Sequence, residues 1–260
     1  MSQSWPLKRV GLRVRNLEST LAYYQQLGLA IVRDERVEGI VGLGAGELEL
    51  LTLRHTPDAP VRQPHTAGLY HFAILLPGET DLASFLRNSV NGAGVRIDGA
   101  SDHLVSQALY LNDPEGNGIE VYADRPREQW SYTPNGGVVM DTIRLRANEL
   151  LAKAQDFHGF PEGTILGHMH LNVRNLDESI AFYEQTFGLN TMAKIYDQAG
   201  FVSWDGYHHH LGLNTWTGPN ATRHEPGVSG IEFFEFSRPD LPTGTYQDPN
   251  GVTIVVSDSE

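Results

Sequence analysis

The chain has 260 residues, which is long enough for two domains with hydrophobic cores of their own. Its net charge of −13 argues against nucleic acid or an anionic membrane as a main partner, and the absence of cysteine excludes disulfides, thiolate-bound zinc and cysteine nucleophiles. No apolar run approaches the roughly 20 residues of a membrane helix, and the N-terminus lacks a signal-peptide pattern. We therefore expect a cytoplasmic protein. The sequence does not determine whether it is a monomer or a homo-oligomer.

The first predicted unit is a strand followed by a helix. Apolar residues alternate with others over 10–14, which predicts a strand with one buried face. Asn16 is suited to cap a helix whose apolar positions recur at helical spacing from residue 17, and Gly28 is suited to end it. Strands are expected next at 39–53.

A second unit of the same kind follows in the first half. A strand is predicted at 69–76 and a helix at 81–91. Two further strands, 108–112 and 118–123, flank a turn built on Asp113-Pro-Glu-Gly116.

The segment 126–164 is predicted to be a linker, because its ends are rich in Pro, Gly and Asn. We expect one short helix in it, over 146–154. This divides the chain into an N-terminal domain, 1–125, and a C-terminal domain, 165–260.

The C-terminal domain repeats the N-terminal one. Residues 10–26 return as residues 169–185, with 8 of the 17 positions identical. The Asp113 turn returns as Asp248-Pro-Asn-Gly251, but at an offset shorter by 24 residues. The sequence thus indicates a duplication in which the last unit has lost about that length, including its helix.

Four motifs make the pattern recognisable. They are Leu-x-Val-x-Asn-Leu with the following Ala-(Tyr/Phe)-Tyr, and the stretches 68–73, 101–120 and 206–216. Together they resemble the vicinal-oxygen-chelate superfamily of glyoxalases, bleomycin-resistance proteins and dioxygenases, and within it the bacterial two-domain catechol-2,3-dioxygenase group. The resemblance implies an α+β fold of tandem βαβββ modules that pair into two cup-shaped domains, here with a shortened last module.

The same resemblance implies a metal-dependent ring-cleaving dioxygenase whose substrates are a small aromatic diol and dioxygen. Two histidines and one carboxylate leave open positions on Fe(II) for both substrates. Fe(II) is therefore the expected cofactor, with Mn, Zn and Ni as alternatives. Seven of the 11 histidines follow residue 130, and without cysteine this limits a metal site to imidazole and carboxylate ligands. The resemblance implies that the C-terminal domain is the catalytic one.

For that domain we predict His168, His210 and Glu235 as metal ligands. His168 and His210 fall on ligand places of the family. The family's glutamate place, seven residues after the Asp of the turn, is occupied by Val255, so Glu235 is taken as its substitute from an alignment that sets Phe233 opposite His71. A register slip of one residue would overturn that step.

A rival site lies in the N-terminal domain. His71 and Glu120 both occupy family ligand places there, and Glu49 is a candidate third ligand. Arg9 occupies the first ligand place, and a cation is a poor replacement for a metal ligand, so this site ranks second.

Two residues are catalytic candidates, and two others are set aside. His208 would share a strand face with His210 and is suited to move protons. Tyr246 lies near a tyrosine of the family signature, although packing between aromatic rings would explain it as well. His103 and His224 are expected to be loop residues.

Two other functions fit the same residues. One is a glyoxalase- or epimerase-like enzyme that uses Zn, Ni or Mn with a carboxylate base. The other is a metal-free binding protein of the resistance type, which Val255 and the shortened last module favour.

Overall fold

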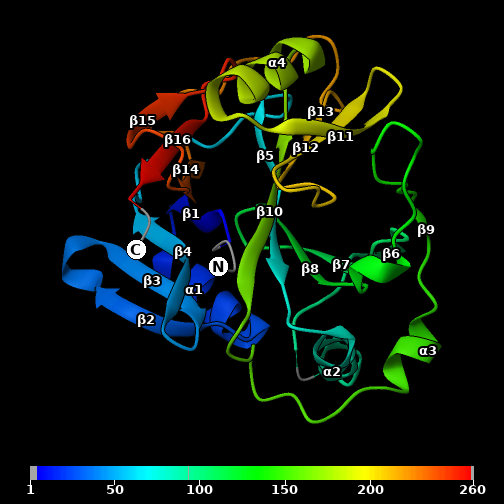
Figure 1. The fold of residues 1–260 in the computed structure, drawn as a ribbon. Coiled ribbons are helices and arrows are strands. Elements are labelled where there is room, and N and C mark those ends of the chain that lie inside the picture. The colour runs from blue at the N-terminus through cyan, green and yellow to red at the C-terminus, as the bar shows by residue number, and fades with distance from the viewer. Residues whose placement is uncertain (1–4, 93, 259–260) are drawn as a thin grey trace.

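The structure, a computed structural model, describes residues 5–92 and 94–258 and combines two curled sheets with helices packed on their outer sides (Figure 1). None of the helices in these residues is long and apolar enough to cross a membrane. The α+β class and the modular organisation expected from the sequence are confirmed.

The helices are α1 (Leu17–Leu27), α2 (Glu79–Val90), α3 (Ala147–Leu151) and α4 (Leu176–Phe187). The strands of the first two modules are β1 (Leu7–Val14), β2 (Ala30–Glu35), β3 (Ile40–Ala45), β4 (Leu48–His55), β5 (Gly68–Leu75), β6 (Gly99–Asp102), β7 (Ser106–Asn112) and β8 (Gly118–Asp124). The remaining strands are β9 (Ile143–Arg144), β10 (Ile165–Asn172), β11 (Asn190–Ile195), β12 (Ala199–Ser203), β13 (Leu211–Asn214), β14 (Gly230–Ser237), β15 (Gly244–Gln247) and β16 (Thr253–Ser257).

Each sheet takes strands from both halves of the chain. The seven-stranded sheet runs β15-β16-β14-β1-β4-β3-β2, and the nine-stranded sheet runs β11-β12-β13-β10-β5-β8-β7-β6-β9. The first module thus pairs with the last, and the second with the third. We expected each half to close its own cup; instead, the antiparallel pairs β1–β14 and β5–β10 join the halves. The sequence division at 1–125, 126–164 and 165–260 remains a prediction, and the sheets cross it.

The repeated helices begin as the sequence predicts. The side chain of Asn16 accepts a hydrogen bond from the backbone N–H of Ser19, and that of Asn175 accepts one from Glu178. Gly188 ends α4 in the left-handed conformation with φ 70°. Apolar residues of both helices are buried in the core cluster between helix and sheet.

The linker segment is ordered against the nine-stranded sheet. Its short strand β9 pairs with β6 and forms the edge of the sheet, and its helix α3, shorter than the expected 146–154, packs beside α2. In Figure 1 this segment runs down one side of the nine-stranded sheet, in green. It therefore contributes a wall to the cup of this sheet.

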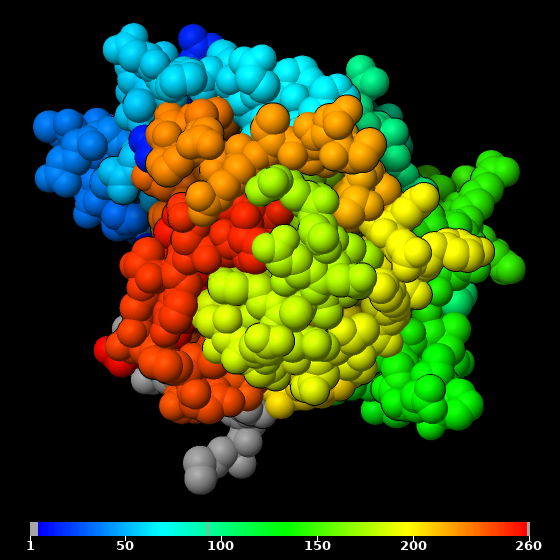
Figure 2. Space-filling model, turned by 90° about the horizontal axis from the view of Figure 1, so that it is seen from above, coloured from blue at the N-terminus to red at the C-terminus, as the bar shows by residue number. Residues whose placement is uncertain are grey.

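The last module is short, as expected. Within the described part of the chain, β14 is followed by the hairpin of β15 and β16 in place of a helix. Figure 2 shows these strands, in red, directly beside the yellow-green segment of α4. The hydroxyl of Tyr183 on α4 donates to the carboxylate of Asp248 at 3.1 Å, which ties the hairpin to the helix.

Candidate metal centre

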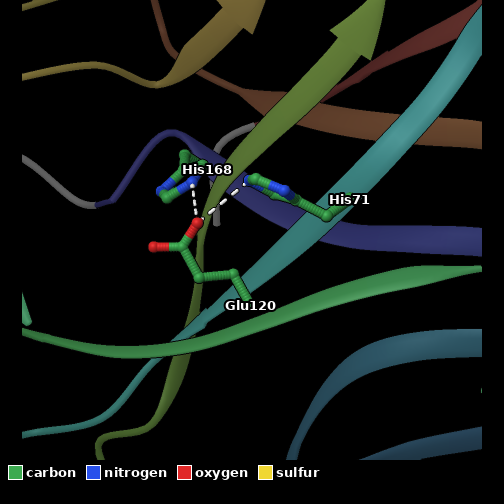
Figure 3. A group of neighbouring side chains, drawn as sticks. All are labelled: His71, Glu120 and His168. Carbon is green, nitrogen blue, oxygen red and sulfur yellow. Dashed lines mark ion pairs between the residues drawn. The ribbon is translucent and has the colours of Figure 1, made fainter. Parts of the chain in front are cut away.

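Three polar side chains converge at the centre of the nine-stranded sheet. His71 lies on β5, Glu120 on β8 and His168 on β10, and these are adjacent strands in the order β10-β5-β8. Nε2 of His71 lies 3.0 Å from Oε2 of Glu120, and Nε2 of His168 lies 3.3 Å from the same oxygen (Figure 3). All the candidate ligand atoms lie within 4.8 Å of one another.

Strand alternation explains why these side chains share one face. On β5 and β8 the neighbours Phe72 and Ile119 point into the core, so His71 and Glu120 point into the cup. On β10, Met169 belongs to the core and His168 to the cup. The pairing of β5 with both β8 and β10 then places the three polar residues side by side.

The electrostatics favour the deprotonated forms of His168 and Glu120. Burial lowers the pKa of His168 to about 4, against the opposing pull of Glu120. Burial alone would raise the pKa of Glu120, but His168 and His71 lower it well below its usual value. A neutral imidazole beside an ionised carboxylate is the donor set that a divalent cation binds.

The residues present fit such a cation. Nε2 of His71, both ring nitrogens of His168 and Nε2 of His170 are buried, and none of them makes a hydrogen bond of suitable geometry to the residues that the structure describes. The approaches of His71 and His168 to Glu120 are close contacts between charged or polar atoms without that geometry. A buried polar atom left without a partner costs about 1–3 kcal/mol. Two imidazoles and one carboxylate that converge from three strands form the ligand set of non-haem Fe(II) oxygenases, which leaves positions open for substrates.

A cavity of about 310 Å³ opens beside the three residues. Tyr70, Phe201 and Trp216 supply aromatic walls, and Met140 and Asp141 of the linker segment close one side. A Cβ atom on Gly212 would lie 2.9 Å from the ring of His170, so this glycine makes room for a further cavity-lining imidazole.

His103 and Tyr110 form a polar pair in the cavity wall. Nδ1 of His103 lies 2.9 Å from the backbone oxygen of Asp141, and Nε2 lies 2.6 Å from the hydroxyl of Tyr110. Because a carbonyl oxygen only accepts, Nδ1 carries the proton of a neutral ring and Nε2 accepts from the phenol. Burial and the charge of Glu120 raise the pKa of Tyr110, so its hydroxyl remains protonated.

The three consecutive histidines take different places. His209 lines the cavity, with its ring centroid 4.1 Å from that of His168. His208 lies behind it, fully buried. His210 points away toward Trp5 and Trp204, and its Nδ1 accepts a hydrogen bond from the backbone N–H of Trp204.

The structure therefore does not bring together the ligand set His168, His210 and Glu235. His210 precedes β13, which begins at Leu211, so strand alternation did not apply to it. Glu235 lies on β14 in the other sheet, where its carboxylate accepts a hydrogen bond from Nε of Arg9 at 2.6 Å. Only His168 of the three belongs to the cluster.

The two catalytic candidates also lie apart from each other, one next to the cavity and one in the other sheet. His208 is one residue removed from the cavity-lining His209, which it contacts. Tyr246 lies on β15 of the other sheet, where its ring packs on Phe187 and its hydroxyl donates to the backbone oxygen of Pro242. The packing explanation thus describes Tyr246.

The rival set is also split between the sheets. His71 and Glu120 meet as that alternative supposed, but their third partner is His168 and not Glu49. Glu49 pairs with Arg33 and Arg9 on the seven-stranded sheet. The cluster thus contains His71 and Glu120 from the rival site and His168 from the first predicted site.

Four cavity residues were missed as site residues: His103, Tyr110, His170 and His209. A signal was present for the first two, because both lie in the stretch 101–120 that carries the family resemblance. Strand alternation was used to place the neighbouring His208 and His210. His209 lies in a loop before β13, which does not follow that alternation.

Comparisons with known proteins show which family and fold this chain resembles. The family model described as "Glyoxalase/Bleomycin resistance protein/Dioxygenase superfamily" matches residues 7–121 and 165–247. A protein of Bacillus subtilis (strain 168) named "Catechol-2,3-dioxygenase" is 40% identical over 230 residues, which cover 86% of this chain and 79% of that protein.

Two solved structures share the fold. A putative dioxygenase from Bacillus subtilis matches with a TM-score of 0.63 at 14% identity, covering 99% of this chain and 86% of the other. Glyoxalase I from Zea mays matches with a TM-score of 0.60 at 17% identity, covering 97% and 92%. At these identities the likeness concerns the fold alone.

Proposed function

Because the chain belongs to the glyoxalase/bleomycin resistance protein/dioxygenase superfamily, we propose that it is a metal-dependent extradiol dioxygenase that opens the ring of a catechol-type aromatic. The observation that carries the proposal is the convergence of His71, Glu120 and His168 beside an aromatic-walled cavity. The 40% identical relative, named as a catechol-2,3-dioxygenase, supports the same reaction. We propose Fe(II) as the metal and dioxygen as the second substrate, with Mn, Zn or Ni as less suited alternatives.

His71, Glu120 and His168 would hold the cation. The chemistry that such a cation supplies is chelation of both diol oxygens together with binding of dioxygen beside the ring. The aromatic walls of Tyr70 and Phe201 would hold the ring and exclude water.

Proton handling would fall to residues in the cavity wall. The ring of His209 lines the cavity, and its Nδ1 faces His208, so its Nε2 is the nitrogen available to accept a proton from the diol. The hydroxyl of Tyr110 donates to Nε2 of His103, so its oxygen remains free to accept a hydrogen bond from a protonated substrate oxygen.

The test compares Glu120→Gln and His168→Ala with the wild type after anaerobic loading with Fe(II). We expect about one iron per wild-type chain, little in either variant, and a loss of ring-opening activity of at least about 10³-fold. His158→Ala, which changes an exposed loop histidine, is the matched control and should behave as wild type.

Three measurements decide the result: bound iron, oxygen consumption, and the coloured ring-opened product. Full activity in both variants would refute the proposed site. Turnover of a 2-oxoaldehyde thiol adduct without oxygen consumption, together with inactivity on catechols, would instead establish a glyoxalase-type enzyme.

A further inference from the structure

A chain of hydrogen-bonding groups leads from the cavity toward the surface. Nδ1 of His209 lies 2.7 Å from Nδ1 of His208, and Nε2 of His208 lies 2.9 Å from Oδ1 of Asp124. His208 is fully buried, whereas the side chain of Asp124 is 24% exposed. Asp124 ends β8, four residues after Glu120, so the chain starts near the candidate metal centre and ends in solvent.

The donors and acceptors along this chain can be assigned. A carboxylate only accepts, so Nε2 of His208 carries a proton and donates it to Asp124. A neutral His208 then accepts at Nδ1, which requires Nδ1 of His209 to be the donor. The remaining nitrogen of His209, Nε2, therefore bears a lone pair on a ring that lines the cavity.

The surroundings hold the ring of His208 in place. Its ring centroid lies 4.0 Å from that of Tyr207 and 5.2 Å from that of Trp130. The indole N–H of Trp130 donates to the backbone oxygen of Arg125, which anchors this wall to the end of β8. These contacts on both sides of the ring fix the orientation of His208 between His209 and Asp124.

We propose that Asp124 is a positioning residue for the reaction: acting through His208, it holds His209 with the Nε2 lone pair available to the substrate. This inference rests on the proposed function for its catalytic consequence. Neither Asp124 nor His208 touches the substrate, and their contribution is to select one of the two tautomers of His209. Without the carboxylate, His208 has no acceptor for its Nε2 proton, and both rings are free to exchange tautomers.

A double-mutant cycle tests the catalytic part. We expect Asp124→Ala to lower kcat about 10-fold to 100-fold, with KM and bound iron unchanged. Because Asp124 acts through His209, the same change should have no further effect in a His209→Gln background. Asp124→Asn keeps an oxygen that can accept from Nε2 and should retain most of the activity. Asp240→Ala, an exposed carboxylate paired with Arg238, is the control.

Equal losses in the two backgrounds would overturn the inference, since they would show that Asp124 supports the fold and not His209. Thermal unfolding of each variant excludes loss of structure as the cause.

The tautomers can be read without any turnover. In ¹⁵N-histidine-labelled protein, free of iron or loaded with Zn²⁺, we expect His209 protonated at Nδ1 and His208 at Nε2, and a mixture of tautomers in Asp124→Ala. Protonation of His209 at Nε2 in the wild type, or no change in the variant, would refute the assignment. If the wild type opened no catechol, the proposed function would fail, and the NMR spectra would still decide the role of Asp124.

Discussion

At the scale of single residues, the two sheets differ at the places that matter for a metal. Matching residue pairs across neighbouring strands show which positions of the two sheets correspond. The pair of Gly11 and Phe233 corresponds to the pair of His170 and His71. The pair of Glu235 and Val255 corresponds to the pair of Ala73 and Glu120. The ligand places His168, His71 and Glu120 are thus Arg9, Phe233 and Val255 in the seven-stranded sheet. A guanidinium and two apolar side chains cannot hold a cation, so we expect metal in one cup only.

Glu235 belongs to a network of ion pairs with Arg9 and Glu49 in the seven-stranded sheet. Its carboxylate faces Arg9, whose side chain is 35% exposed. We expect Glu235→Gln to lower the free energy of unfolding by about 1 kcal/mol and to leave bound iron unchanged, because the pair is only partly screened by solvent. Urea unfolding and iron analysis measure the two effects.

The exposed pair between Arg146 and Glu149 supplies the comparison. Glu149→Gln should cost no more than about 0.5 kcal/mol. Loss of iron in Glu235→Gln would contradict the separation of the two cups.

The buried side chain of His210 makes the free energy of unfolding depend on pH. Burial, followed by the charges of His208 and Arg238, lowers the pKa of His210 well below its usual value. In the unfolded chain that pKa is about 6.5, so below this pH the unfolded state binds the proton first. The stabilisation is therefore complete above about pH 6.5 and is lost as the pH falls.

We expect the stability of metal-free protein to fall between pH 7 and pH 5, and His210→Gln to remove up to about 1.4 kcal/mol per pH unit of that slope. Urea unfolding at several pH values measures it. At pH 8 the two proteins should show the same slope, and identical slopes at pH 5–7 would refute the assignment.

At the scale of elements, the repeated Asp-Pro turns connect modules. The hydroxyl of Tyr24 on α1 donates to Asp113 at 2.9 Å, and that of Tyr183 on α4 donates to Asp248. Each bond joins the helix of one module to the turn of the next. The turn that the sequence predicts as a local feature is thus also a long-range anchor.

Removal of this hydroxyl should loosen the anchor. We expect Tyr24→Phe to lower the free energy of unfolding by about 1–2 kcal/mol, because it leaves the buried carboxylate of Asp113 with one partner fewer. The adjacent Tyr23 has a buried hydroxyl without a hydrogen-bond partner in the described structure, so Tyr23→Phe should not destabilise the protein. Equal costs in the two variants, measured by urea unfolding, would contradict this role of the turn.

At the scale of the whole molecule, the sequence predicts the modules but not their partners. Alternation and the repeat identify the helices and the strands next to the core, because these are local patterns, whereas the strands β2, β6, β9, β11 and β15 were not predicted. Which modules share a sheet depends on contacts between residues far apart in the chain, and the same alternation satisfies either pairing. His71, Glu120 and His168 were therefore each recognised, yet assigned to two separate sites.

The loop of 206–210 marks a second limit of the sequence. Strand alternation favoured His208 and His210, but the strand begins only at Leu211, and the loop turns His209 into the cavity. Loop conformation is set by neighbours such as Trp130 and Asp124 that no local pattern reveals. Even so, the family resemblance predicts a ligand set of two imidazoles and one carboxylate, and the cluster His71, Glu120 and His168 has this composition.

For the proposed dioxygenase activity, the rim of the cavity predicts which catechols would be preferred as substrates. Tyr70, Ile195 and Trp216 expose 41–51% of their surface there, which is a high exposure for large apolar side chains that line one opening. Among the described residues that line the cavity there is no lysine or arginine, and Asp141 adds a carboxylate. A substrate with its own carboxylate would therefore lose water without gaining a cationic partner.

We expect kcat/KM for an uncharged catechol with an apolar ring substituent to exceed that for a carboxylated catechol by at least about 100-fold, which corresponds to about 3 kcal/mol of unpaired charge. Met140→Lys, which adds a cation to the cavity wall, should narrow the ratio, because the ammonium pairs with the substrate's carboxylate. Val139→Lys adds the same charge at a neighbouring residue that does not line the cavity, and should leave the ratio unchanged. Steady-state oxygen uptake measures all three proteins, and a wild-type preference for the carboxylated substrate would show that an apolar rim does not set the specificity.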